Sequence, residues 1–359
     1  MVAFGKREGT IVHEARPFNA EPSRQALGEA SITPADAFYA RCHGAIPSGA
    51  GSWALEIGGL AGQPLRLSVE ELRDGRFAER EVVATLQCAG NRRSGLMAVR
   101  EIPGEAPWGP GATGTATWRG VRLAEVLGAV GPHEDATHVA FVGADTSEEA
   151  HPPQRFGASI PIEKAMGEEV LLAWSMNGED LVPLHGAPLR IVVPGYIGAR
   201  SVKWLTHVEL RSTPFDGYFQ DTVYRLLAPD EEPGPGRGLA LGEVALNADV
   251  LIPGDGSEVG AGATEIRGYA FAGGARHVAR VDVSLDDGST WRQADLLEDL
   301  GRWAWRLWRI ELDLRAGRHE VVVRAWDSSA ASQPEHPRSL WNPKGYVNNS
   351  WGRATITAR

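Results

Sequence analysis

The stretch TLQCAGNRR at residues 85–93 places Cys88 at the end of a short apolar run, just before a tight Gly/Asn turn and two arginines. Nearby cations favour the thiolate over the thiol, and the thiolate is the form that bonds a metal. A soft thiolate beside an anion-holding pair of arginines indicates a redox metal that processes an oxyanion. From these residues alone, a buried structural cysteine beside a surface salt-bridging pair is the alternative.

Further segments accompany this cysteine loop along the chain. They are Arg41-Cys42-His43, Gly157–Pro161, His185–Arg190, Gly198–Trp204 and Trp341–Trp351. Taken in order with the cysteine loop, they resemble the segments of the sulfite oxidase family of molybdopterin oxidoreductases, in its haem-free prokaryotic form. The resemblance covers nearly the whole chain, and the co-occurrence of the segments makes it more specific than the cysteine loop alone.

The resemblance implies an α+β chain of two domains that binds a molybdenum–molybdopterin cofactor. A mixed α/β molybdopterin-binding domain would be followed by an immunoglobulin-like β-sandwich, through which this family forms homodimers. Cys88 would be the one protein thiolate on the metal, beside the two sulfurs of the pterin dithiolene. The cofactor also carries a phosphate, which needs cations and donors. The residues that match cofactor-holding positions are His43, Cys88, His185, Arg190, Arg200, Ser201 and Lys203.

The cofactor residues also have structural interpretations when each is taken singly. His185 could be a satisfied turn histidine before Gly186, and Arg190 and Lys203 could be surface charges on strands. Both cations can pair with phosphate, the arginine in a bidentate way. As an ordered set in register with the cysteine loop, they favour the cofactor interpretation.

The resemblance further implies a cationic pocket for a small anionic substrate, sulfite. Arg41 and Arg93 match the sulfite-binding arginines of the family. Tyr224 matches its active-site tyrosine, and Trp108 matches a pocket tryptophan in a loop of unusual form. Lys344 stands where sulfite oxidases carry a third substrate arginine and where nitrate reductases carry a methionine. Lysine keeps the charge but loses the planar fork, which favours sulfite over nitrate, with weaker binding.

Two other positions depart from the family pattern. Cys42 stands where asparagine is more frequent, which puts an oxidisable thiol beside the pocket. Val223 stands where an acid often precedes the tyrosine, which would alter the local charge network.

The leading functional hypothesis is molybdenum-dependent oxidation of sulfite to sulfate, with electrons passed to an external acceptor. One alternative is a nitrate reductase-like or other oxo-transfer enzyme on the same fold, and another, of a different class, is a non-catalytic molybdopterin-binding protein. The chain length leaves no room for a fused haem or flavin domain, so we expect no haem here and a separate acceptor, with a cytochrome as one candidate.

Composition argues against several classes of function. The net charge of −10 argues against a nucleic-acid partner and means that an anionic substrate needs a local positive pocket. No run of about 18 apolar residues exists, so we expect no membrane span. The N-terminal residues lack the apolar segment of a signal peptide, which predicts a cytoplasmic location, or a periplasmic one if a leader was removed. A Cys42–Cys88 disulfide is a competing hypothesis, because it would remove the metal ligand.

The chain divides into three predicted regions. Residues 1–30 are polar and irregular and predict an arm over the surface, and residues 31–232 mix helix and strand signals. The Pro- and Gly-rich stretch at residues 228–238 predicts a linker, after which residues 239–359 follow an all-β pattern.

Local signals predict individual elements. Thr33-Pro34 and Ser68 are predicted helix starts, the second with a capping box to Glu71, and residues 123–130 are a predicted helix. Residues 81–86, 139–142 and 189–193 are predicted strands. In the all-β region, residues 281–285 alternate, residues 286–289 and 315–317 predict turns, and a phase shift near Leu307 predicts a β-bulge. Its many tryptophans are interpreted as core, in a two-sheet sandwich.

Overall fold

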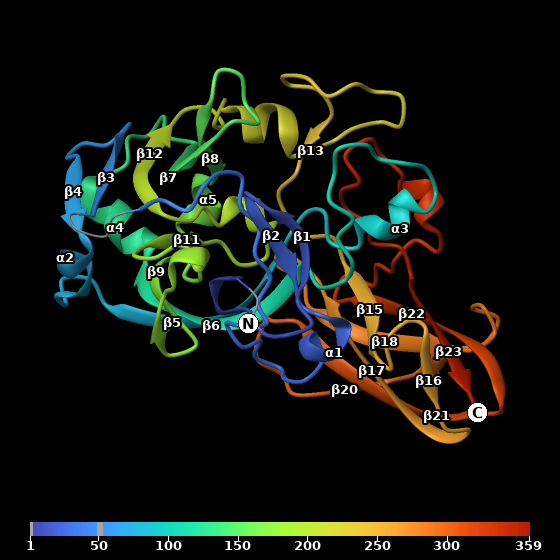
Figure 1. The fold of residues 1–359 in the computed structure, drawn as a ribbon. Coiled ribbons are helices and arrows are strands. Elements are labelled where there is room, and N and C mark those ends of the chain that lie inside the picture. Colours follow the sequence, from blue (N-terminus) through green and yellow to red (C-terminus); the bar gives the residue numbers. More distant parts are fainter. Residues whose placement is uncertain (1–2, 49–52) are drawn as a thin grey trace.

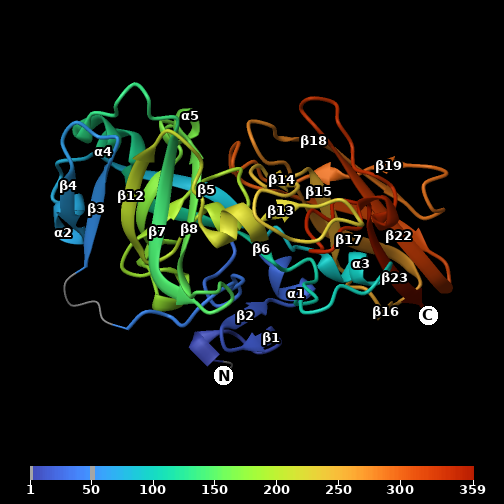
Figure 2. The ribbon, with the colours of Figure 1, turned by 90° about the horizontal axis from the view of Figure 1, so that it is seen from above.

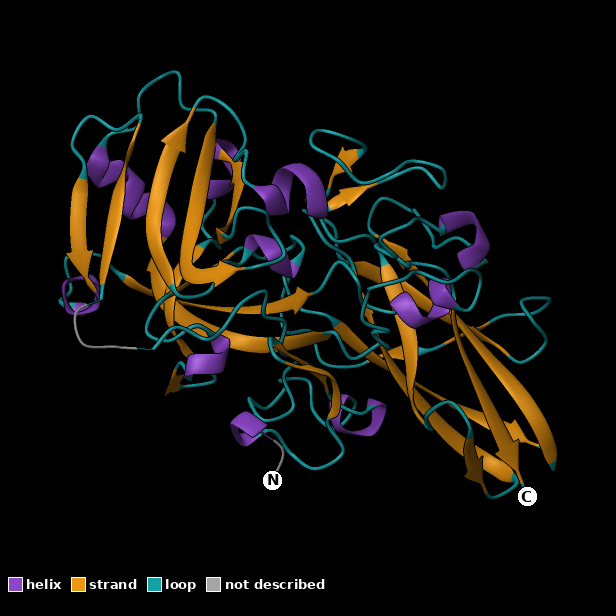
Figure 3. Cartoon of the chain, turned by 45° about the horizontal axis from the view of Figure 1, so that its top comes forward, coloured by secondary structure: helices purple, strands orange, loops and turns teal. Residues whose placement is uncertain are grey.

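The computed structural model describes residues 3–48 and 53–359. Strands make up most of its regular structure, and its helices are short (Figure 3). The strands gather in two groups, one formed by the first part of the chain and one by the last, and two views show them side by side (Figures 1 and 2). Among the described residues, no helix has the length and apolar character needed to cross a bilayer.

Two sheets form the first group. One has the order β10-β9-β6-β5, with β11 also paired to β9, and the other has the order β4-β3-β12-β7-β8. Their strands are β3 (Ala54–Gly59), β4 (Leu65–Ser68), β5 (Glu79–Gln87), β6 (Thr113–Arg122), β7 (His138–Ser147), β8 (Gln154–Pro161), β9 (Leu171–Met176), β10 (Glu179–Asp180), β11 (Arg190–Val192) and β12 (Leu205–Arg211). The strands predicted at residues 81–86, 139–142 and 189–193 are confirmed as β5, β7 and β11.

Strand β5 carries the chain from the surface into the core. Its first residues are exposed and its last four are buried, and it pairs with β6 from Glu79↔Val121 to Gln87↔Thr113. Cys88 follows directly, so the cysteine loop begins where the strand has reached the interior.

Helices occur as short segments around the sheets. They are α1 (Arg24–Leu27), α2 (Val69–Arg73), α3 (Arg93–Met97), α4 (Leu123–Val130) and α5 (Ile162–Ala165). The predicted helix at residues 123–130 is confirmed as α4, and the predicted capping box is present at α2. Ser68 Oγ accepts a hydrogen bond from Glu71 N at 3.1 Å, and the Glu71 carboxylate accepts one from Ser68 N at 2.7 Å.

The helix start predicted at Thr33-Pro34 is wrong. The residues after Thr33 form a turn, and Thr33 Oγ1 accepts a hydrogen bond from Thr115 N of strand β6 at 3.1 Å. The Thr33 hydroxyl that would have capped a helix therefore accepts a hydrogen bond from a residue 82 positions away.

The N-terminal region is also more ordered than predicted. It forms the hairpin β1 (Ile11–Ala15) and β2 (Phe18–Glu21), and every residue of β2 is buried. Glu21 can be buried because its two carboxylate oxygens accept hydrogen bonds from Gly109 N at 2.6 Å and Gly111 N at 2.8 Å. The hairpin lies at the junction of the two groups of strands (Figures 1 and 2).

The last part of the chain forms the second group, a sandwich of two sheets as predicted. Their orders are β15-β17-β21-β20 and β16-β23-β22-β18-β19, and apolar side chains from both fill the space between them. The strands are β15 (Asn247–Ile252), β16 (Ser257–Val259), β17 (Gly262–Phe271), β18 (Val278–Ser284), β19 (Arg292–Gln293), β20 (Asp295–Leu296), β21 (Arg306–Leu314), β22 (Gly317–Asp327) and β23 (Gly352–Ala358). Residues 228–238 hold neither helix nor strand, and a small pair, β13 (Arg225–Leu226) with β14 (Leu239–Ala240), brackets them.

The bulge predicted near Leu307 is wrong. Strand β21 pairs with β17 without interruption from Gly262↔Leu314 to Ala270↔Arg306. Leu307 and Trp308 are consecutive residues of β21. Both are buried because both faces of the sheet are covered there. Trp308 packs into the sandwich, whereas Leu307 packs against the first group of strands. The break in alternation therefore marks a junction between the two groups, not a change of register.

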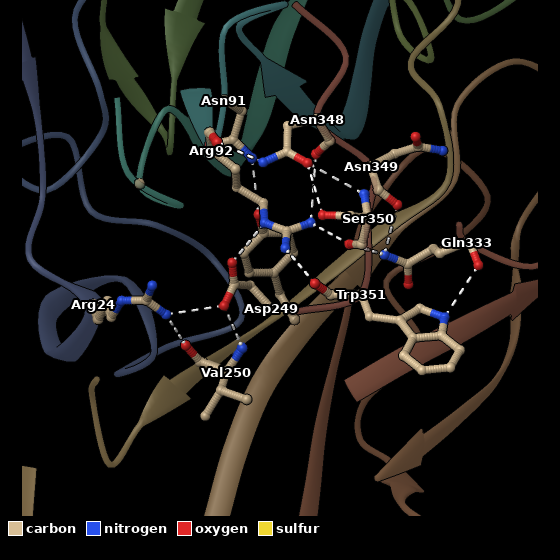
Figure 4. A network of polar contacts seen from close by, with 12 residues as sticks. Arg24, Asn91, Arg92, Asp249, Val250, Gln333, Asn348, Asn349, Ser350 and Trp351 are labelled. Carbon is tan, nitrogen blue, oxygen red and sulfur yellow. Dashed lines mark hydrogen bonds and ion pairs between the residues drawn. The ribbon is translucent and has the colours of Figure 1, made fainter. Parts of the chain in front are cut away.

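A buried polar network joins the cysteine loop to the sandwich (Figure 4). Arg92 Nε pairs with Asp249 Oδ2 at 2.7 Å, and Arg24 Nη1 donates to Asp249 Oδ1 at 2.9 Å. Arg92 also donates to the carbonyls of Ser350 at 2.7 Å and Trp351 at 3.0 Å. The side chains of Arg92 and Asp249 are 8% and 4% exposed, so each charge depends on the other.

We expect Asp249→Ala to lower the free energy of unfolding by about 3–5 kcal/mol, because removing one partner of a buried ion pair leaves the other charge uncompensated. Urea unfolding would measure this change. The matched control is Glu56→Gln, whose carboxylate faces Arg66 at 3.9 Å in an exposed pair and should change stability by less than about 0.5 kcal/mol. Equal effects of the two substitutions would contradict the role of Asp249.

Candidate active site

A cavity opens beside the cysteine loop. Strand ends and loops of the first group supply its wall, and residues before β3, after β5 and after β11 meet there. Its polar lining is Tyr39, Arg41, Cys42, His43, Cys88, Asp145, His185, Arg190, Ser201, Lys203 and Tyr224. Eight of the twelve residues predicted for the site lie in this lining: Arg41, His43, Cys88, His185, Arg190, Ser201, Lys203 and Tyr224.

Cys88 is one of the residues that line this cavity. Both cysteines are free thiols, so the Cys42–Cys88 disulfide hypothesis is wrong. Gly90 N donates to Cys88 Sγ at 3.4 Å. No cluster of three or more His, Cys, Asp or Glu side chains suited to a metal exists in residues 3–48 and 53–359. A metal at this thiol would therefore need other ligands, such as the sulfurs of a dithiolene.

Burial raises the pKa of Cys88, although Arg93 and Arg41 act in the opposite direction. The expectation that the arginines alone favour the thiolate is therefore wrong for the protein without a metal, because loss of hydration outweighs them. A bound metal would displace the thiol proton, since metals bind the thiolate.

One wall of the cavity is cationic. Lys203 Nζ lies 3.0 Å from Cys42 Sγ and 4.2 Å from the centre of the Trp204 ring. Arg190 donates to the carbonyls of His185 at 2.9 Å and Ser201 at 3.0 Å, so one hydrogen of each terminal nitrogen is used within the wall.

Two lining residues carry buried polar atoms that no residue of the described chain satisfies. They are Asp145 Oδ1 and Arg190 Nε. Burial raises the pKa of Asp145, a carboxyl in the lining, to about 6, so it takes up a proton more easily than an exposed aspartate does. Unpaired donors and acceptors beside Arg41, Lys203 and a free thiol fit a polar, anionic group that binds a metal through sulfur.

A hydrogen-bonded chain runs from the cavity toward the surface. The hydroxyl of Tyr224 lies 2.7 Å from His43 Nε2, and His43 Nδ1 lies 2.8 Å from the Glu149 carboxylate. A carboxylate only accepts, so His43 Nδ1 carries the proton and Nε2 accepts from Tyr224. Tyr224 is 4% exposed, whereas the Glu149 side chain is 40% exposed. The three groups therefore connect a buried phenol to a carboxylate in contact with solvent.

A short helical turn presents Tyr224. The residues Phe219–Val223 form one turn of π-helix, a rare element that often occurs at functional sites. Phe219 packs against the His43 ring, with ring centroids 4.4 Å apart, and so orients the imidazole. Burial raises the pKa of Tyr224, which keeps the phenol protonated.

Arg93 and Lys344 do not line the cavity but meet at a common acid. Glu105 pairs with Arg93 Nη2 at 3.1 Å and also contacts Lys344 Nζ. Arg93 additionally donates to the Lys344 carbonyl at 3.0 Å. Glu105 therefore neutralises part of the positive charge that the sequence assigned to substrate binding.

Trp108 and Arg200 also lie outside the cavity lining. Trp108 is buried beneath the cysteine loop, where its carbonyl accepts from Ser94 N at 3.0 Å. Arg200 is buried and donates to Gln220 Oε1 at 2.6 Å and to the Leu241 carbonyl. In this structure both residues contact protein groups that support the site.

Sequence reasoning missed several polar residues of this region. Asp145, Glu149 and Glu105 lie in loops or strand ends without any motif, and Lys6 comes from the segment predicted to be irregular. Their only sequence signal is a charge near an apolar run, which is indistinguishable from a surface residue.

Comparison with known proteins agrees with this geometry. A family model described as the oxidoreductase molybdopterin binding domain matches residues 43–219, and one described as the Mo-co oxidoreductase dimerisation domain matches residues 240–359. Sulfite oxidase from Gallus gallus is 40% identical over 366 residues, which cover 97% of this chain and 78% of that protein. Nitrate reductase [NAD(P)H] from Hordeum vulgare is 37% identical over 385 residues, which cover 99% of this chain and 42% of that protein.

A solved structure is similar along the whole length. The sulfane dehydrogenase SoxCD from Paracoccus pantotrophus superposes with a TM-score of 0.82 at 25% identity, covering 99% of this chain and 90% of that chain. The chain spans 65% of the length of the mitochondrial sulfite oxidases of Macaca fascicularis and Rattus norvegicus.

These findings define a molybdenum oxidoreductase with a molybdopterin-binding domain followed by a dimerisation domain. The chain belongs to the sulfite oxidase family of molybdopterin oxidoreductases. The predicted fold class, an α+β chain that ends in a β-sandwich, is confirmed.

We expect acid to lower the stability of the folded protein through the protonation of His43. Burial and, next, the nearby Arg41 lower the pKa of His43 from 6.5 to about 4. Between these two pH values His43 is protonated in the unfolded chain but neutral in the folded chain. The free energy of unfolding therefore falls by about 3 kcal/mol as the pH falls from 6.5 to 4. Urea unfolding of wild type and His43→Gln at pH 7, 5.5 and 4 should show the larger loss in wild type. Parallel pH profiles would contradict the assignment.

Proposed function

We propose that this protein oxidises sulfite to sulfate and passes the electrons to a separate acceptor. The observation that carries the proposal is a buried free thiol, Cys88, in a cavity whose charged lining is cationic except for Asp145. The similarity to sulfite oxidases and to a sulfane dehydrogenase supports a reduced sulfur compound as substrate.

Cys88 would hold molybdenum as its single protein ligand, and His43, His185, Arg190, Ser201 and Lys203 would hold the pterin and its phosphate. When bound, the molybdenum–pterin group supplies oxygen transfer and takes up two electrons. Arg200 would act indirectly, through Gln220 and Leu241, by fixing the chain that follows Gly198–Arg200.

The substrate residues would orient the anion and manage its protons. Arg41 would position sulfite, with Arg93 and Lys344 completing the positive field, and would stabilise charge on the oxygens. Tyr224 donates its one hydroxyl proton to His43, so its oxygen would accept a hydrogen bond from a protonated oxygen in the pocket, and His43 and Glu149 would pass the proton onward to solvent. Trp108 would support the cysteine loop from beneath.

Cys88→Ser tests the ligand assignment. We expect the variant to lose turnover of sulfite with ferricyanide as the acceptor, because a hydroxyl binds a soft metal poorly, while circular dichroism shows an unchanged fold. Elemental analysis of pure wild-type protein should find about one molybdenum per chain. Wild-type activity in the serine variant would remove Cys88 from the metal site.

Glu105→Gln tests the shared acid. Removing its charge should free Arg93 and Lys344 for the anion and lower KM for sulfite about five-fold, as expected for about 1 kcal/mol of charge interaction. The matched control is the exposed neighbour Glu101→Gln, which should leave KM unchanged. A higher KM in Glu105→Gln would mean that the acid orders these cations and does not neutralise them.

Nitrate reduction is the second candidate function, because a nitrate reductase shares 37% identity with this chain. Lys344 favours sulfite, since it keeps a cation at a position where the resembled nitrate reductases carry methionine. A reductant-driven nitrate assay beside the sulfite assay separates the two activities.

The organisation of the molecule adds further proposals. We assign residues 1–30 to an N-terminal arm, 31–232 to the catalytic domain and 239–359 to the dimerisation domain, which would form a homodimer. A soluble redox protein such as a cytochrome is the proposed acceptor, with the cytoplasm as the proposed compartment.

A further inference from the structure

Lys6 comes from the N-terminal segment and ends behind the wall of the cavity. It is 3% exposed, and its Nζ donates to the Ala35 carbonyl at 2.7 Å and the Phe38 carbonyl at 2.5 Å. The third neighbour of Nζ is the ring of His185, with Nε2 at 3.0 Å. Both Phe38 and His185 line the cavity, so the amine supports its wall from outside.

When Lys6 is charged, its contact with His185 decides which ring nitrogen carries the proton. An ammonium group has donors and no acceptor, so His185 Nε2 then accepts from Lys6 and does not donate to the Ala35 carbonyl, 3.4 Å away. Burial lowers the pKa of His185 well below its ordinary value, which keeps the ring neutral and its proton on Nδ1. No residue in 3–48 or 53–359 makes a hydrogen bond with Nδ1. The ring therefore has one free donor in a cavity wall.

The charges around His185 point to an anion as the partner of that donor. Lys6, Lys203 and Arg190 surround the imidazole, and Asp36 is the acid that most favours the charge of Lys6. Burial lowers the pKa of Lys6 to about 7, which means that the cation is poorly compensated before an anion binds.

We propose that Lys6 is a cofactor-positioning residue, which holds His185 as a neutral Nδ1–H donor aimed at an anionic group of the bound molybdopterin. The N-terminal segment would thereby close the cofactor site from behind and slow the loss of the cofactor. This inference rests on the proposed function of the cavity as the cofactor site.

A purely structural role would explain fewer of the contacts. Two carbonyls already satisfy part of the amine, and a neutral donor could serve them without bringing a buried charge beside Lys203. The third donor is used on a ring that lines the cavity, as in other sites where an outer partner sets the tautomer of a binding histidine.

The test is retention of molybdenum and pterin by the full chain, measured by elemental analysis and by pterin fluorescence after prolonged dialysis. Lys6→Met should retain about tenfold less of both than wild type, the lower end of effects seen for outer partners of metal sites. The matched control is Arg7→Met, which removes the neighbouring cation and its pairs with Glu29 and Asp36 but touches no cavity residue, and it should retain both. If Lys6→Met does not fold, Lys6→Gln takes its place in the test, because glutamine keeps donors for the two carbonyls.

A double-substitution cycle separates positioning from general stability. If Lys6 acts through His185, Lys6→Met should cause little additional loss in a His185→Gln background. Full retention by Lys6→Met, or losses that multiply in the double variant, would overturn the inference alone. Absence of molybdenum from wild type and Arg7→Met would instead overturn the proposed function, and the inference with it.

Discussion

The ion pair of Arg92 with Asp249 ties the cysteine loop to the second domain, and the geometry of the site depends on it. Arg92 has the left-handed backbone angle φ 64°, which an L-residue adopts at a cost of about 1 kcal/mol or more. Its guanidinium offsets this strain by bonding Asp249 and two carbonyls of the dimerisation domain. The turn then sends Arg93 the opposite way, toward Glu105 and the proposed substrate side. The turn at Arg92 thus gives two adjacent arginines different partners: Arg92 pairs with Asp249 and Arg93 with Glu105.

Charge is distributed unevenly between the surface and the site. The chain has a net charge of −10, yet the cavity lining holds Arg41, Arg190 and Lys203 against one carboxyl, Asp145. Burial strengthens this local field, because screening by water and salt is weak inside the protein. Glu105 then moderates the field next to Arg93. Selectivity for a small oxyanion would therefore come from the pocket, against the repulsion of the whole molecule.

The sequence predicted features that depend on neighbours along the chain. The capping box at Ser68 and the helix over residues 123–130 are local, and both form as expected. The lining residues came from ordered motifs, so the cavity gathers most of them. Thr33 and Glu21 could not be predicted, because their partners, Thr115, Gly109 and Gly111, lie 82 to 90 residues away. Lys6 is the extreme case, with its partner ring 179 residues along the chain.

Strand β21 has a further consequence for how the molecule can move. Its residue Leu307, with Trp305 just before it and Tyr269 on the adjacent strand, shares one apolar cluster with the catalytic domain, and Trp305 N donates to Thr85 Oγ1 of β5 at 2.8 Å. Separating the two halves would expose these aromatic rings to water and break the hydrogen bond from Trp305 to Thr85, so the junction opposes a hinge motion between them. The dimerisation half, separated from the first half, would expose an aromatic face that favours aggregation.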